Sequence, residues 1–187
     1  MELTREKVLP LVMRAYSPCY DIAYADEQDA PLVATAAFHE HDTGYVLTKR
    51  ATMWTADRHE YVYLFSMPHL TLELYQSCLA KARELGEPLV DPAPGHMSTN
   101  IVALFLCDTA DEDAVKALRK CRIQKCFQFS LRGWMEVHTA MVELGKDSFK
   151  ANFAGQNTAK FLKNVLHPKV RRKPFPYRKK VRSVEKP

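Results

Sequence analysis

The sequence predicts a single α+β domain over residues 1–167, with helices packed on a largely antiparallel sheet, and a basic tail over residues 168–187. Three observations predict this fold. Segments with the alternation of strands are interleaved with segments of helical periodicity. The run Ile101–Cys107 is continuously apolar, as in a strand at the middle of a sheet. The composition, 47% hydrophobic and 26% charged, is that of an ordinary globular protein.

The first part of the chain predicts a helix and a three-stranded meander. Apolar residues recur at helical spacing up to Tyr16, and Pro10 implies either a start near Leu9 or a kink. The polar residues 56–59 are predicted as the loop of a central hairpin. The three predicted strands cover residues 32–41, 45–55 and 60–65.

A helix is predicted after the meander, capped by Ser66, with Pro68 in its first turn and Gly86 at its end. Residues 87–96 contain three prolines and a glycine and are predicted as a loop.

The second part of the chain predicts a central apolar strand, a helix, a hairpin and a last short helix. The central strand covers residues 100–107, and a capping box at Thr109–Glu112 begins the next helix. Arg132-Gly133 is the predicted turn of a C-terminal hairpin with strands over 126–131 and 134–144. The predicted order of elements is α-β-β-β-α-β-α-β-β-α.

The cysteines and the apolar segments indicate a cytoplasmic protein. Five cysteines, without a CxxC pair, predict buried reduced thiols rather than disulfides or a zinc site. The N-terminal residues lack a signal-peptide pattern, and no apolar run is long enough to span a bilayer, so no membrane insertion is expected. Neither a GxGxxG nor a Walker A motif occurs, and no cofactor is predicted.

Charge is concentrated in the tail. It contains nine of the 27 Lys and Arg residues and one acid, so the tail carries about +8 and the rest about −3. Cations neutralise phosphates and aromatic rings stack on bases, so the tail predicts contact with single-stranded nucleic acid or RNA. An acidic protein partner and the acidic body itself are the alternatives. The residues predicted to bind are Lys169, Arg171, Arg172, Lys173, Phe175, Tyr177, Arg178, Lys179, Lys180 and Arg182.

The predicted sheet offers a second binding surface. Lys49, Arg50, Trp54 and Tyr61 are expected on an exposed face of the central hairpin, where charged and aromatic side chains favour recognition. Together with the tail, this surface predicts a non-catalytic binding or accessory protein.

One stretch has the residue types of a metal site. His39-Glu40-His41-Asp42 places two histidines on one face of a strand, similar to the HxH of metal-dependent hydrolases. It lacks the following histidine of those enzymes, and two ligands specify little. His39 and His41 are therefore either weak metal candidates or the polar end of a strand.

The predicted order of elements through Cys107 resembles the core of the PD-(D/E)XK nuclease superfamily. The resemblance implies Mg²⁺ held by an acid on the second strand and by an acid-x-Lys on the third. Asp42 and Glu60 would be the acids, but Val62 stands where the lysine belongs, so Lys49 would have to supply the charge. Because only the element order carries the resemblance, a metal-dependent nuclease, or a decayed, binding-only relative of that fold, is the alternative function.

Overall fold

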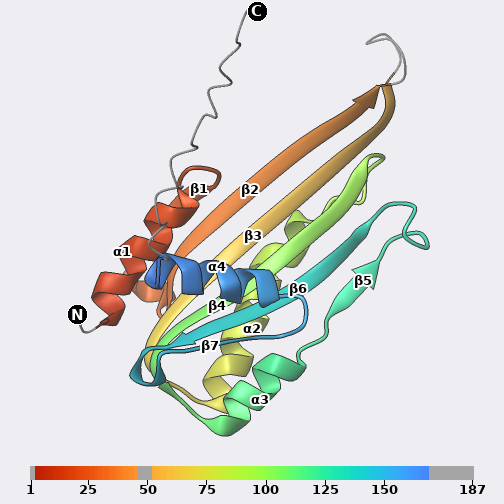
Figure 1. Cartoon of the computed structure of the whole chain (residues 1–187). Coiled ribbons are helices and arrows are strands. Elements are labelled where there is room, and N and C mark those ends of the chain that lie inside the picture. Colours follow the sequence, from red (N-terminus) through yellow and green to blue (C-terminus); the bar gives the residue numbers. More distant parts are fainter. Residues whose placement is uncertain (1–2, 46–51, 169–187) are drawn as a thin grey trace, which may run out of the picture.

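The computed structural model describes residues 3–45 and 52–168, and for residues 42–45 and 52–55 only the backbone is described. Within these residues seven strands form one mixed, mostly antiparallel sheet (Figure 1). The strands are β1 Asp21–Tyr24, β2 Leu32–Tyr45, β3 Thr52–Leu70, β4 His96–Ala110, β5 Gln124–Cys126, β6 Trp134–Glu143 and β7 Ser148–Ala151. The helices are α1 Arg5–Tyr16, α2 Leu72–Gly86, α3 Glu112–Lys120 and α4 Gln156–Leu166.

The strands lie in the order β1-β2-β3-β4-β6-β5, and β7 pairs with β6. β4 pairs with one edge of β6 along its whole length. The other edge of β6 is shared by β5, which pairs with the beginning of β6, and β7, which pairs with its end. The predicted α+β class and element order are close to what is observed. The prediction of a largely antiparallel sheet is confirmed in part, because the central strand β4 runs parallel to both β3 and β6.

The predicted meander has the wrong strands. Residues 56–59, predicted as a loop, lie inside β3 and pair with residues 39–42 of β2. Of the predicted strand over 45–55, Tyr45 belongs to β2 and residues 52–55 belong to β3, and residues 46–51 lie outside the described residues. The third strand of the meander is β1, which pairs with β2. The pairing of long strands outweighed the local turn preference of the polar residues 56–59.

The start of α2 differs from the prediction for the same reason. Ser66 and Pro68 belong to β3, which continues to Leu70. Thr71 caps the helix instead, and its hydroxyl accepts a hydrogen bond of 3.1 Å from the backbone N–H of Leu74. The predicted end at Gly86 is confirmed.

A C-terminal hairpin is present, but the predicted first strand over 126–131 is wrong except at Cys126, because the strand is Gln124–Cys126. β5 ends at Cys126, and residues 127–133 form a loop before β6. The predicted last helix is present; it begins at Gln156 after the cap residue Gly155. The short strand β7 was not predicted.

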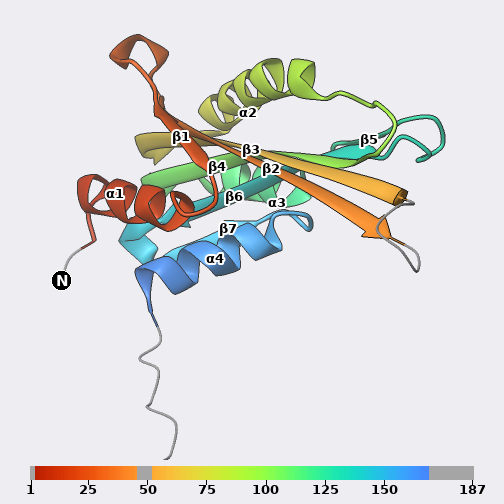
Figure 2. The same ribbon diagram turned by 90° about the horizontal axis from the view of Figure 1, so that it is seen from above.

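Helices cover both faces of the sheet (Figure 2). α1 and α4 pack on one face, here called the front, against side chains such as Val62 and Leu104. α2 and α3 pack on the back face against a second core that includes Phe65 and Phe105. None of the helices in the described ranges is long and apolar enough to cross a membrane.

The cysteines are all free, as predicted, but not all are buried. Cys78 and Cys107 are buried, and burial raises the pKa of Cys78 to about 11 and that of Cys107 to about 12. Cys19 and Cys126 are exposed, so the prediction of buried thiols is wrong for these two.

Candidate functional site

The charge of the chain divides at Arg119, well before the tail. Residues 1–118 carry 18 Asp and Glu against nine Lys and Arg, whereas residues 119–187 carry four against 18. The net charges are −9 and +14. The described part of the basic segment forms the end of α3, the strands β5, β6 and β7 at one edge of the sheet, and α4, which crosses the front face toward α1 (Figure 1). We call this part of the molecule the cationic side.

A groove of about 460 Å³ between β7 and α4 carries four lysines. Lys160 and Lys163 are one helical turn apart on α4, so they project from the same side of the helix. Lys150 comes from β7, and Lys146 from the turn before it. We call Lys146, Lys150, Lys160 and Lys163 the lysine groove.

Three of these lysines have no counter-ion among the described residues. Lys146 contacts Glu143 at 2.8 Å, and this hydrogen bond raises the pKa of Lys146. Lys150, Lys160 and Lys163 are exposed, and no ion pair joins them to another described side chain. Lysines in this state are point charges available to an external anion.

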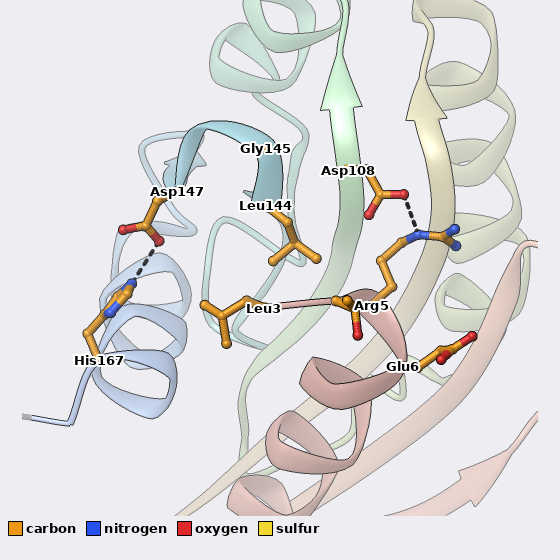
Figure 3. Close-up of a pocket in the computed structure, with 9 residues that line it drawn as sticks. Leu3, Arg5, Glu6, Asp108, Leu144, Gly145, Asp147 and His167 are labelled. Carbon is orange, nitrogen blue, oxygen red and sulfur yellow. Dashed lines mark hydrogen bonds and ion pairs between the residues drawn. The ribbon is translucent and has the colours of Figure 1, made fainter. Parts of the chain in front are cut away.

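The acid that lines the groove is already engaged. Asp147 also borders a hollow of about 800 Å³ at the start of α1, shown in Figure 3. There its carboxylate accepts a hydrogen bond of 2.7 Å from His167, across the hollow from the ion pair of Arg5 with Asp108 at 2.9 Å. The Asp147 carboxylate is thus oriented toward the end of α4.

A second group of cations follows the edge strand β5. They come from the end of α3, from β5 and from the loop after it, and no acid occurs between Ala114 and Met135. We call this set the basic edge: Arg119, Lys120, Arg122, Lys125 and Arg132. A hollow of about 490 Å³ lies between β5 and the loop before α4, lined by Arg122, Gln124, Glu136 and Phe153.

Asn152 joins the basic edge to the lysine groove. Its side chain is buried and fills the gap between β5 and β7 along β6. The Oδ1 atom accepts hydrogen bonds from the backbone N–H groups of Thr139 (3.1 Å) and Gly155 (2.7 Å). The Nδ2 group donates to the carbonyls of Val137 (2.9 Å) and Cys121 (3.1 Å). Both polar atoms of the amide are satisfied, and the end of α3, β6 and the start of α4 are held together.

The predicted tail residues, Lys169 to Arg182, lie outside the described residues. The described chain reaches Pro168, directly after the end of α4. The tail therefore follows the helix that supplies Lys160 and Lys163.

The predicted sheet surface is described only in part. Lys49 and Arg50 lie outside the described residues, and for Trp54 only the backbone is described. Tyr61 is half-buried on the back face, where its ring contacts that of His39 at a centroid distance of 5.7 Å. Burial raises the pKa of Tyr61.

The residues of the nuclease-like reading are not brought together. Asp42 pairs with Ala56, whereas Glu60 pairs with Phe38, four residues further along β2. The two backbone positions are thus about 13 Å apart along the strands. The Glu60 carboxylate accepts hydrogen bonds from Tyr20 (2.8 Å) and Asn100 (3.4 Å). The proposed third member, Lys49, is not described.

His39 and His41 each have a separate partner on β3. The Nδ1 atoms of His39 and His59 lie 2.8 Å apart, and His41 contacts the Asp57 carboxylate. Because the Nδ1 atom of one ring must accept the hydrogen bond, that ring is neutral and carries its proton on Nε2, while the other ring donates from Nδ1. No group of three metal-ligating side chains occurs in the described parts of the chain.

His96 completes a histidine cluster that the sequence analysis missed. Its ring stacks on that of His59, with centroids 6.4 Å apart. His96 is buried, and both of its nitrogens have partners, the Arg132 carbonyl at 2.7 Å and the Thr99 hydroxyl at 2.9 Å. The register of β2 with β3 places His39 opposite His59, and the parallel pairing of β3 with β4 brings His96 beside them, so both registers are needed to reveal the cluster.

The cluster predicts a loss of stability in acid. Burial lowers the pKa of His59 below 6.5, and His39 and His96 lower it further, against the opposing effects of Asp57 and Asp91. Below that value the unfolded state binds a proton more readily than the folded state, so stability falls as the pH falls toward the folded pKa. Thermal unfolding from about pH 7.5 to about pH 5.5 should show a smaller decline for His59→Gln than for the unchanged protein. An equal reduction in His69→Gln, on another part of the fold, would contradict this assignment.

Comparison with known proteins shows the family. No curated protein and no solved structure matches the chain. A family model described as "Domain of unknown function (DUF8052)" matches residues 4–164. The matched range includes the lysine groove and the basic edge and stops before the tail. The chain belongs to this family, DUF8052.

Proposed function

We propose that the protein is a non-catalytic binding protein that holds single-stranded nucleic acid along its cationic side. The observation that carries this proposal is the placement of charge. The segment from Arg119 onward has a net charge of +14, and its described part, residues 119–168, has nine Lys and Arg against three acids and supplies β5, β6, β7 and α4. Lysines without counter-ions are suited to phosphate oxygens, because contact with them releases condensed counterions from the nucleic acid.

The shape of the cationic side favours an extended ligand. The lysine groove lies between β7 and α4, and the hollow lined by Arg122 and Phe153 lies between β5 and the loop before α4. Asn152 fixes these two parts to each other. A strand of phosphates could follow both, and the tail would add nine further cations. Lysine contacts position the backbone without reading bases, so binding should depend little on sequence.

A salt series tests the proposal. The full chain is titrated into a labelled single-stranded RNA at several NaCl concentrations between about 0.05 and about 0.4 M. We expect log Kobs to fall linearly with log salt, with a slope of about −0.7 for each phosphate contacted. No binding at the lowest salt would reject the proposal.

Two controls separate the alternatives. Unlabelled RNA should displace the labelled strand more effectively than polyglutamate of equal charge. Equal displacement by polyglutamate would favour an acidic protein partner instead. RNA and DNA incubated with the protein and Mg²⁺ should stay intact, whereas metal-dependent cleavage would favour the nuclease alternative.

A further inference from the structure

The loop between β5 and β6 presents large apolar side chains to solvent. Phe129 is 100% exposed and Leu131 is 83% exposed. Gln128, Phe129 and Ser130 have φ values of 46°, 52° and 68°, a left-handed conformation that such residues rarely adopt in succession. Backbone conformations of this kind persist where the surrounding structure imposes them, often at functional sites.

Main-chain hydrogen bonds hold this loop in place. The N–H of Arg132 donates to the carbonyl of Phe127 at 3.2 Å, and the N–H of Phe127 donates to the carbonyl of Gly133 at 3.0 Å. Gly133 has a φ of 72°, and a Cβ there would lie 2.3 Å from the carbonyl oxygen of Met97. The exposure of Phe129 is therefore a property of the folded loop.

A second exposed phenylalanine lies beside the other end of β5. Phe153 is 84% exposed and lines the same hollow as Arg122. Between the two rings is the basic edge, where the Lys125 ammonium lies 5.7 Å from the centroid of Phe127. No acid occurs in the segment 114–135, and the acid that lines the hollow, Glu136, lies 3.6 Å from His138. Apolar rings flanked by cations are complementary to a ligand that has both negative charges and flat apolar faces.

Resting on the proposed function, we infer that Phe129 and Phe153 stack on unpaired bases while the basic edge between them contacts the phosphates. Unpaired bases offer their π faces, whereas the bases of a duplex are already stacked on each other. The two rings would thus make the protein prefer single strands over duplexes. Stacking accepts any base, which agrees with binding that depends little on sequence.

The test compares one RNA sequence as a single strand and as a duplex, at one salt concentration, with full-chain variants. Phe129→Ser and Phe153→Ser should each weaken single-strand binding about 5- to 100-fold and leave duplex binding unchanged. The control is Tyr24→Ser, because Tyr24 is a 68% exposed aromatic on β1 at the opposite edge of the sheet. It should change neither affinity. Phe129→Trp should retain single-strand binding, and its added fluorescence should be quenched by the bound RNA.

The outcomes distinguish this inference from the proposed function. Equal affinity of the unchanged protein for single strand and duplex, with the salt dependence intact, would overturn the inference and leave the proposed function standing. The absence of binding to either RNA would overturn both. If Phe129→Ser leaves RNA binding intact and instead abolishes binding to vesicles of anionic phospholipid, the loop is a membrane contact and the inference is wrong.

Discussion

Replacement of Asn152 by alanine should lower the free energy of unfolding by about 3 to 5 kcal/mol. The amide group makes four hydrogen bonds to backbone groups and is 2% exposed. Truncation leaves the N–H groups of Thr139 and Gly155 and the carbonyls of Val137 and Cys121 without these bonds, and each such loss in a buried site costs about 1–3 kcal/mol. Denaturant unfolding monitored by circular dichroism measures the change.

Two further variants separate hydrogen bonding from packing. Asn164 is an exposed residue of α4, and Asn164→Ala should change stability by no more than about 0.5 kcal/mol. Asn152→Asp keeps the size of the side chain but replaces the donor by a second acceptor facing two carbonyls. It should destabilise at neutral pH about as strongly as alanine. A loss below about 1 kcal/mol in Asn152→Ala would show that the amide is not what joins the end of α3, β6 and α4.

Neutralisation of the lysine groove should weaken RNA binding by about 100-fold at about 0.1 M salt. The variant combines Lys150→Gln, Lys160→Gln and Lys163→Gln. Each phosphate contact releases about 0.7 cations, so three contacts contribute about 2 to the slope of log Kobs against log salt. Between about 1 M and about 0.1 M salt, this slope corresponds to an affinity difference of about 100-fold. The three side chains are exposed and outside the two cores, so the fold should be unaffected. Fluorescence anisotropy of labelled single-stranded RNA measures the effect.

A matched control removes the same charge from the acidic half of the molecule. The control variant combines three substitutions on α1 and α2: Lys7→Gln, Arg14→Gln and Lys81→Gln. This variant has the same net charge as the lysine-groove variant, so any difference between the two reports position rather than overall attraction. We expect the control to weaken binding much less. Equal losses would mean that the groove is not a site.

The fold could be predicted where local pattern and tertiary packing agree. The apolar run Ile101–Cys107 is the core of β4, and the helix ending at Gly86 is α2. The predictions are wrong where the local sequence pattern and the tertiary packing favour different structures. Residues 56–59 have turn-forming polarity but pair with β2, and Ser66 could cap a helix but continues β3. In both places, the hydrogen bonds of a long strand outweigh the local preference for a turn or a helix cap.

The site was harder to predict because its charges come from separate elements. The tail is conspicuous as a run of basic residues, so the sequence predicts a boundary at residue 168. The change in charge begins at Arg119, where cations are spaced too widely along the sequence to stand out. β7 and α4 bring Lys150, Lys160 and Lys163 to one groove only in the fold. Similarly, the pairing of His39 with His59 follows from a register that the misplaced hairpin loop concealed.

The most direct test of the central claim is the salt dependence of RNA binding in the unchanged chain and in the lysine-groove variant. The claim is that single-stranded nucleic acid lies along the cationic side. If this is correct, the slope of log Kobs against log salt is smaller in magnitude by about 2 in the lysine-groove variant and is unchanged in the matched control. Identical slopes in all three proteins would contradict it.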